Sequence, residues 1–185
     1  MHLTPRHAAA GLGVALALTA WVLPLGDWLG GFQAHMLRHA LLVAVVPALV
    51  APALPMRGAP PLLLAAGAEF AAAWGWHLPG PHMAALLSPA LGALEQASFL
   101  LSGLAVWWSA RAAGPLGGAA SLLLTSIHMT MLGGAILLAP RVLYPYCDLD
   151  AQATGAMIML AIVTPAYLLG GLAHARRALG GEVGA

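Results

Sequence analysis

The stretch that decides the fold is FQAHMLRHA, residues 32–40, where an apolar segment opens with two histidines four residues apart. In a helix, His35 and His39 lie one turn apart on the same face, so both imidazoles can reach one shared partner. The apolar run behind them continues to Leu54 and is long enough to cross a membrane. Ionisable groups in such a segment usually face a bundle interior or a pathway. The pair therefore predicts a polar site inside a membrane protein.

The composition agrees with a membrane protein. Of 185 residues, 61% are hydrophobic and only 7% are charged, against roughly 25% charged in an ordinary soluble domain. The mean hydropathy is +0.88, so we expect the chain to lie among membrane lipids. Seven arginines are dispersed along the chain and no lysine is present, which argues against a nucleic-acid surface. The single cysteine, Cys147, excludes an intramolecular disulfide and a CxxC motif.

The apolar runs predict an all-α, polytopic helical bundle that forms a single transmembrane domain over residues 1–185. A span needs about 20 apolar residues to cross about 30 Å of hydrocarbon. About six such spans are expected, at approximately residues 8–25, 32–54, 60–78, 89–110, 116–139 and 151–173. We expect the first run to be retained as a helix rather than cleaved as a signal peptide, because further spans follow it at once.

The placement of the arginines predicts that the N- and C-termini are both cytoplasmic, since cytoplasmic loops hold the positive excess. With six spans, one side holds Arg6, Arg57, Arg111, Arg176 and Arg177, and the other holds Arg38 and Arg141. Most side chains of the metal-ligand type then lie near the outer face of the membrane.

The histidines near that face are the candidate metal ligands. His35 and His39 could hold copper or zinc, because imidazole suits both metals; alternatively, they only hydrogen-bond neighbouring helices. His77, in WGWHLPG at residues 74–80, ends the third span at the same level, so we expect it to join the pair, although a plain interfacial role is the alternative. His82 follows in a connector and is expected to be solvated.

His128 lies near the middle of the fifth span, and two interpretations of it stay open. It could be the deep ligand of the metal site, or it could hydrogen-bond to Glu69, which is expected at a similar depth. Met36 and Met129 are supporting candidates, because thioethers suit Cu(I). Methionine is also ordinary apolar filling, which is the expected role of most of the eight methionines.

Three carboxylates could support the site. Glu95, about one turn into the fourth span, is expected to orient an imidazole. Glu69, inside an apolar helix, is expected to be a protonated acid bonded to a neighbour. Asp150 precedes the last span and is expected to cap it; coordination of a cation is the alternative.

Several stretches together make the chain similar to a known family. They are FQAHMLRHALLVAVVPALVAPALP (32–55), WGWHLP (74–79), ALEQASFLLSGLAVWW (93–108), MLGGAILLAPRVLYPYC (131–147) and DAQATGAMIM (150–159). In their order and wording they resemble the bacterial cytochrome c oxidase assembly factor CtaG family, from about Leu25 to Leu172. The chain departs from the usual family pattern at Gln96, where a histidine commonly follows the glutamate.

The resemblance implies a membrane assembly factor for haem-copper oxidase that binds or passes copper on the periplasmic side. It implies a multi-pass protein of the bacterial inner membrane whose partners are oxidase subunits. The metal site could form within one chain or between copies in a homo-oligomer. An enzyme is the least expected class, because no nucleophile and base are paired by spacing.

Two other classes stay open. A membrane redox protein could use histidines of facing helices as haem ligands, so haem and zinc are alternatives to copper as the bound group. A small transporter or scaffold without metal could use Glu69 and His128 as an ion relay.

Overall fold

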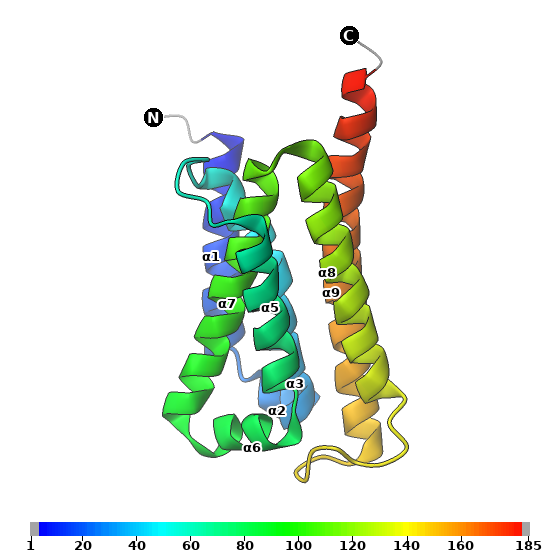
Figure 1. The fold of residues 1–185 in the computed structure, drawn as a ribbon. Helices are drawn as coiled ribbons and strands as arrows, with labels where there is room; N and C mark the ends of the chain where they lie inside the picture. Colours follow the sequence, from blue (N-terminus) through cyan, green and yellow to red (C-terminus); the bar gives the residue numbers. More distant parts are fainter. Residues whose placement is uncertain (1–3, 183–185) are drawn as a thin grey trace.

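The computed structural model describes residues 4–182, and this part of the chain folds into helices without any strand. Long helical segments run alternately up and down through the bundle (Figure 1). They are α1 (Pro5–Val22), the continuous rod of α3 (Gly31–Ala40), η1 (Leu41–Val45), α4 (Val46–Val50) and η2 (Ala51–Ala53), then α5 (Leu62–Trp76), α7 (Pro89–Ala112), α8 (Gly114–Leu137) and α9 (Leu149–Glu182). Two shorter helices are α2 (Leu25–Leu29) and α6 (Pro79–Leu87). The predicted all-α fold is confirmed.

Within the described residues, four helical segments are long and apolar enough to cross a membrane. They are Gly31–Ala53, Pro89–Ala112, Gly114–Leu137 and Leu149–Gly180. Helix α5 is also apolar but has only 15 residues. Helix α1 starts and α9 finishes at the same end of the bundle (Figure 1). The number of about six spans, and the side of the membrane on which this end lies, stay predictions.

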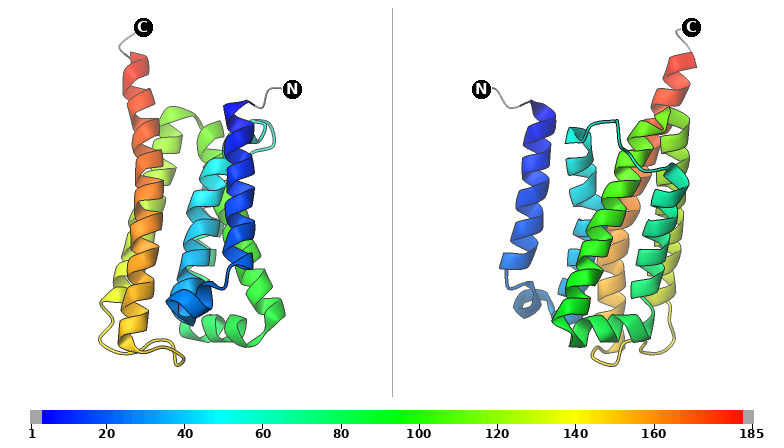
Figure 2. Two further views of the ribbon diagram at one scale, coloured as in Figure 1. Left: turned by 180° about the vertical axis from the view of Figure 1, so that it is seen from behind. Right: turned by 60° about the vertical axis from the view of Figure 1, so that its left-hand side comes forward.

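The helices are arranged as neighbouring antiparallel pairs (Figure 2). Helices α8 and α9 lie side by side along most of their length, while α1 packs on α4 at the other side of the bundle. The α3–α4 rod lies between these pairs and contacts α7 and α9. This central position places the residues of α3 against several other helices at once.

The α3–α4 rod contains one turn of π-helix, Leu41–Val45, which begins two residues after His39. Pro47 follows this turn and has no amide proton, so it cannot donate to the carbonyl of Val43 four residues earlier. In the structure the hydroxyl of Tyr167, on α9, donates to that carbonyl at 2.6 Å. π-helical turns are frequent at functional sites. This one lies just after His39, on the side of the histidine pair that is nearer the middle of the rod.

Two local expectations are corrected by the fold. Residues 79–87 form helix α6, which crosses one end of the bundle, rather than a simple loop. Helix α9 is capped by Asp148 and not by Asp150: Oδ1 of Asp148 accepts a hydrogen bond from the amide of Ala151 at 2.7 Å. Asp150 lies in the first turn of α9 and is exposed, where its charge is favourable near the positive helix end.

Candidate metal-binding site

Four imidazoles lie in a row at one end of the bundle. His35 and His39 come from successive turns of α3, with ring centres 3.9 Å apart. His82, on α6, lies 4.8 Å from the ring of His35, and His77, at the end of α5, lies 5.5 Å from the ring of His39. His35 and His39 thus lie on one face of α3, as predicted from their four-residue spacing. Helix α6 and the end of α5 each bring a further imidazole to this face.

Glu95 contacts the histidine pair from α7. Its Oε1 lies 3.4 Å from Nε2 of His35, and its Oε2 lies 3.5 Å from Nε2 of His39. The side chain of Glu95 is only 1% exposed. The side-chain amide of Gln96 donates to Oε2 of Glu95 at 3.1 Å. Gln96, which stands where the family commonly has a histidine, therefore holds the carboxylate in place and adds no imidazole to the cluster.

The surroundings of His77 and His82 favour neutral imidazoles. Burial lowers the pKa of His82, in the connecting helix α6, to about 4. The ring of His77 is also buried, and burial disfavours a charged imidazole. The Nδ1 of His77 lies 2.6 Å from the carbonyl of Ala73; because a carbonyl only accepts, Nδ1 carries the proton and Nε2 keeps its lone pair. At neutral pH both rings therefore offer a nitrogen lone pair of the kind that binds a metal.

Several polar atoms of the cluster are buried without a hydrogen-bond partner in the described chain. They are Nε2 of His35, both ring nitrogens of His39, Nε2 of His77, Nδ1 of His82 and Oε1 of Glu95. The contacts of Glu95 with the two rings, at 3.4 and 3.5 Å, are too long for good hydrogen bonds. Buried polar atoms are rarely left unsatisfied, and so many together fit a cation held by some members of this row.

The tightest group consists of His35, His82 and Glu95. One ligand atom from each lies within 4.8 Å of the other two. These residues come from α3, α6 and α7, so the group exists only because three helices meet. A small shift of the side chains would bring nitrogen and oxygen atoms to the distance of about 2.0–2.2 Å at which they bind a metal such as zinc.

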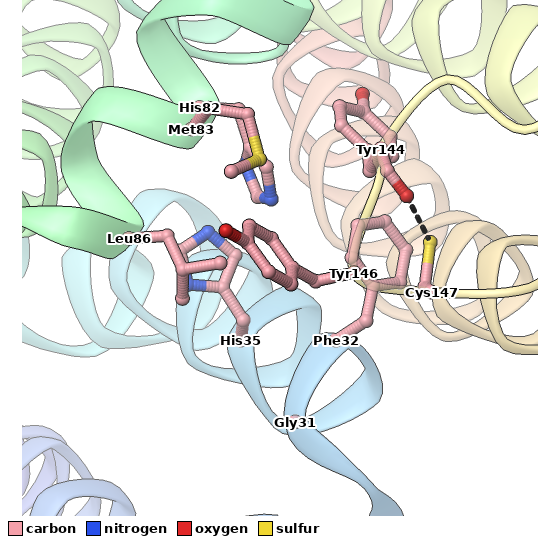
Figure 3. Close-up of a pocket in the computed structure, with 9 residues that line it drawn as sticks. All are labelled: Gly31, Phe32, His35, His82, Met83, Leu86, Tyr144, Tyr146 and Cys147. Carbon is pink, nitrogen blue, oxygen red and sulfur yellow. Dashed lines mark hydrogen bonds between the residues drawn. The ribbon is translucent and has the colours of Figure 1, made fainter.

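A cavity of about 170 Å³ opens beside this group. Figure 3 shows that His35 and His82 face the same space from α3 and α6. The remaining wall includes Met83, Tyr146 and Cys147. A second cavity of about 320 Å³ is lined by His35 and also by Glu95. His35 therefore lies between two openings through which an ion could enter and leave.

The expectation that His82 is solvated is wrong. His82 is only 4% exposed. The centre of its ring lies 5.7 Å from that of Phe32 and 4.5 Å from that of Tyr144. Two prolines, at positions 79 and 81, precede it and start helix α6, since proline suits the first helical turn. This helix start was the sequence signal that could have placed His82 in an ordered element.

His128 forms a pair with Glu69 at another place in the bundle. Nε2 of His128 lies 2.8 Å from Oε2 of Glu69, and the side chain of Glu69 is fully buried. Of the two interpretations of His128, the structure supports the one in which it hydrogen-bonds to Glu69. The ring of His128 also packs against Phe70 of α5, with centres 5.2 Å apart, and neither cavity beside the four histidines is lined by it.

The other supporting candidates lie outside the cavities at the cluster. Met36 is fully buried and packs towards Gly155 of α9. Met129 is 2% exposed and belongs to the core of the bundle. Asp150 is exposed at the start of α9. Met83, next to His82 in sequence, lines the cavity that His35 and His82 also border.

Fold and site together define an integral helical protein with a nitrogen-rich pocket at one end of its bundle. A comparison with known protein families matches residues 3–180 to the cytochrome c oxidase caa3 assembly factor family (Caa3_CtaG). The chain belongs to this family, and the resemblance seen in its sequence is confirmed. No curated protein and no solved structure matches the chain.

Proposed function

We propose that this assembly factor binds a copper ion at the cluster of His35, His39, His77, His82 and Glu95, and passes it to a haem-copper oxidase. The proposal rests on the family and on one observation, the set of buried ring nitrogens and one carboxylate oxygen that have no hydrogen-bond partner. The ion would be the cargo of the protein rather than a catalytic cofactor.

The donor set favours copper or zinc over magnesium or calcium. Imidazole nitrogen suits copper and zinc, whereas magnesium and calcium prefer oxygen ligands. The thiol of Cys147 is a poor additional ligand, because burial raises its pKa and its Sγ donates to the carbonyl of Tyr144 at 3.3 Å. Met83, in the same cavity wall, supplies a soft sulfur that suits Cu(I).

The geometry also fits release of the ion. A closed structural site usually takes four ligands from the protein, whereas here His35, His82 and Glu95 form the tightest group and His35 borders two cavities. Incomplete coordination leaves a position for a ligand of the receiving protein. We expect that protein to be an oxidase subunit that docks at this end of the bundle.

Metal analysis of the purified protein tests the proposal. Wild-type protein loaded with Cu(I) and desalted is expected to retain copper, and His35→Ala and His82→Ala are expected to lose most of it. His7→Ala is the matched control, since His7 is an exposed histidine in the first turn of α1. Equal copper content in all four proteins would reject the ligand assignment.

An optical spectrum of the same preparations separates copper from haem. A protein that carries copper alone has no Soret band. A Soret band lost in His35→Ala would instead assign the histidines to a haem. Retention of zinc but not of copper after loading with both metals would change the proposed cargo to zinc.

A further inference from the structure

A separate cavity of about 350 Å³ lies between the rod of α3–α4, α7 and α9, towards the end of the bundle opposite the four histidines. Its polar wall consists of Trp107, Arg111, His174 and Arg177, and its apolar wall includes Ala48, Pro52 and Ala173. The cavity thus combines two cationic side chains and two ring N–H groups with a surface of small apolar residues.

The guanidinium of Arg111 is held at the cavity by backbone carbonyls. Its Nη1 donates to the carbonyl of Ala51 and, at 3.5 Å, to that of Leu54. These carbonyls lie at the end of the α3–α4 rod, and that of Ala51 also accepts a hydrogen bond from the amide of Leu54 at 3.1 Å. The remaining N–H groups of the Arg111 guanidinium stay available to a hydrogen-bond acceptor in the cavity.

No acidic side chain neutralises these arginines in the described part of the chain. The ion-pair contacts found within 4.0 Å there all join a histidine to Glu69 or Glu95. Arg6 and Arg57 lie at the same end of the bundle as the cavity, whereas Asp27, Asp148 and Asp150 belong to the opposite end. An anion in the cavity would therefore meet an excess of positive charge.

Two buried ring nitrogens in the cavity wall also lack partners. His174 is only 5% exposed and its Nδ1 has no hydrogen-bond partner, and neither has Nε1 of Trp107. The ring of Trp107 is fixed by stacking on Tyr167, with centres 5.5 Å apart. Both nitrogens are enclosed by protein, and Nδ1 of His174 lies against Gly118 of α8. These rings therefore shape the cavity wall, while the two arginines supply its polar contacts.

We propose that this cavity binds the phosphate of an anionic membrane phospholipid, with Arg111 and Arg177 as the cationic contacts. Arginine matches the geometry of phosphate oxygens with paired N–H donors, and basic pockets between membrane helices bind anionic headgroups. The exposed side chain of Leu169 lies on α9 one helical turn before Ala173 of the cavity wall, on a neighbouring part of the helix surface. It offers an apolar surface to an acyl chain, which favours a lipid over free phosphate.

Binding of dioleoylphosphatidylglycerol to the purified full-length protein, followed by native mass spectrometry, tests this site. We expect Arg177→Gln to weaken binding about fivefold, the effect of roughly one cationic contact at a membrane surface, and Arg177→Lys to restore most of it. Arg176→Gln is the matched control: Arg176 is the neighbouring exposed arginine and does not line the cavity. Arg177 is exposed, so its replacement is expected to leave the fold intact.

Three outcomes would overturn the proposal. Equal weakening by Arg176→Gln and Arg177→Gln would mean that the lipid senses only the general surface charge. Equal affinity for dioleoylphosphatidylcholine would mean that net negative charge is not recognised. Inorganic phosphate that binds as tightly as the lipid would assign the cavity to a free anion. Copper retention by Arg177→Gln is expected to equal that of wild type, because the two sites lie at opposite ends.

Discussion

At the scale of single residues, Glu95 connects the imidazoles of the cluster. It lies within 3.5 Å of Nε2 of both His35 and His39 and is almost fully buried. A buried carboxylate is costly unless a positive charge or hydrogen bonds compensate it. A bound cation would supply that charge, so Glu95 ties the electrostatics of the pocket to the presence of the ion.

Glu95→Gln keeps the shape of this side chain and removes its charge. We expect the affinity for copper to fall by about 10–100-fold, the usual effect of losing a carboxylate that supports a metal site. Competition with a chromogenic chelator measures it. Glu69→Gln is the control, because Glu69 is equally buried but pairs with His128 elsewhere; unchanged affinity in Glu95→Gln would contradict the role given to Glu95.

Tyr167→Phe tests the bond to the carbonyl that Pro47 leaves without its helical partner. Removal of the hydroxyl leaves Val43 with an unsatisfied buried carbonyl, and we expect a loss of about 1–3 kcal/mol in the free energy of unfolding. Equilibrium unfolding in detergent micelles measures this loss. Tyr146→Phe, at a residue that is 69% exposed, should leave stability unchanged. Equal stability of both variants would argue against the bond.

At the scale of the elements, the close approach of α7 to the α3–α4 rod keeps the carboxylate near the histidines. Gly103 allows this approach, because a Cβ at this position would collide with the backbone of Val43. Small residues at helix contacts are the usual means of bringing membrane helices together. Since Glu95 and Gly103 lie on the same helix, the spacing of α7 and the rod also sets the distance from Glu95 to the rings.

Gly103→Ala should push α7 away from the rod. Overpacking of this kind costs about 1–3 kcal/mol, and we expect lower thermal stability together with weaker copper binding. Gly67→Ala is the matched control, because nothing lies within 4 Å of a Cβ added there on α5, and alanine is favoured over glycine inside a helix by about 1 kcal/mol. If Gly103→Ala were as stable as Gly67→Ala, the contact would not limit the packing.

At the scale of the whole molecule, charge and chemistry are separated along the bundle. The end with the start of α1 and the finish of α9 carries Arg6, Arg57, Arg111, Arg176 and Arg177, and the other end carries the four histidines of the cluster. The excess of arginine predicts that the first end faces the cytoplasm. The cluster of four histidines would then face the periplasm.

Cysteine labelling tests this orientation. In a Cys147→Ser background, Tyr146→Cys reports on the histidine end and Met56→Cys on the arginine end, and both positions are exposed. In intact cells a membrane-impermeant maleimide is expected to label Tyr146→Cys alone, and Met56→Cys only after lysis. The reverse pattern would place the cluster in the cytoplasm.

The sequence alone was enough for the features that depend on short spacing. Its apolar runs predicted an all-helical membrane protein, and the four-residue interval predicted that His35 and His39 share a face, because helix geometry fixes that relation locally. The resemblance to the family followed from several short stretches of sequence, and the family match over residues 3–180 confirms it. The structure brings His35, His39 and His77 together with Glu95, and metal binding by them stays a prediction.

Only the tertiary structure decided which distant residues meet. It placed His82 in a buried helix against His35, paired His128 with Glu69 instead of the cluster, and gave the cap of α9 to Asp148. In a membrane, the lipid-facing side of a helix is as apolar as its packed side, so hydrophobic periodicity does not reveal which face meets a neighbour. Contacts between helices depend on close packing of small residues and on buried polar atoms finding partners, and neither is visible until the helices are placed in space.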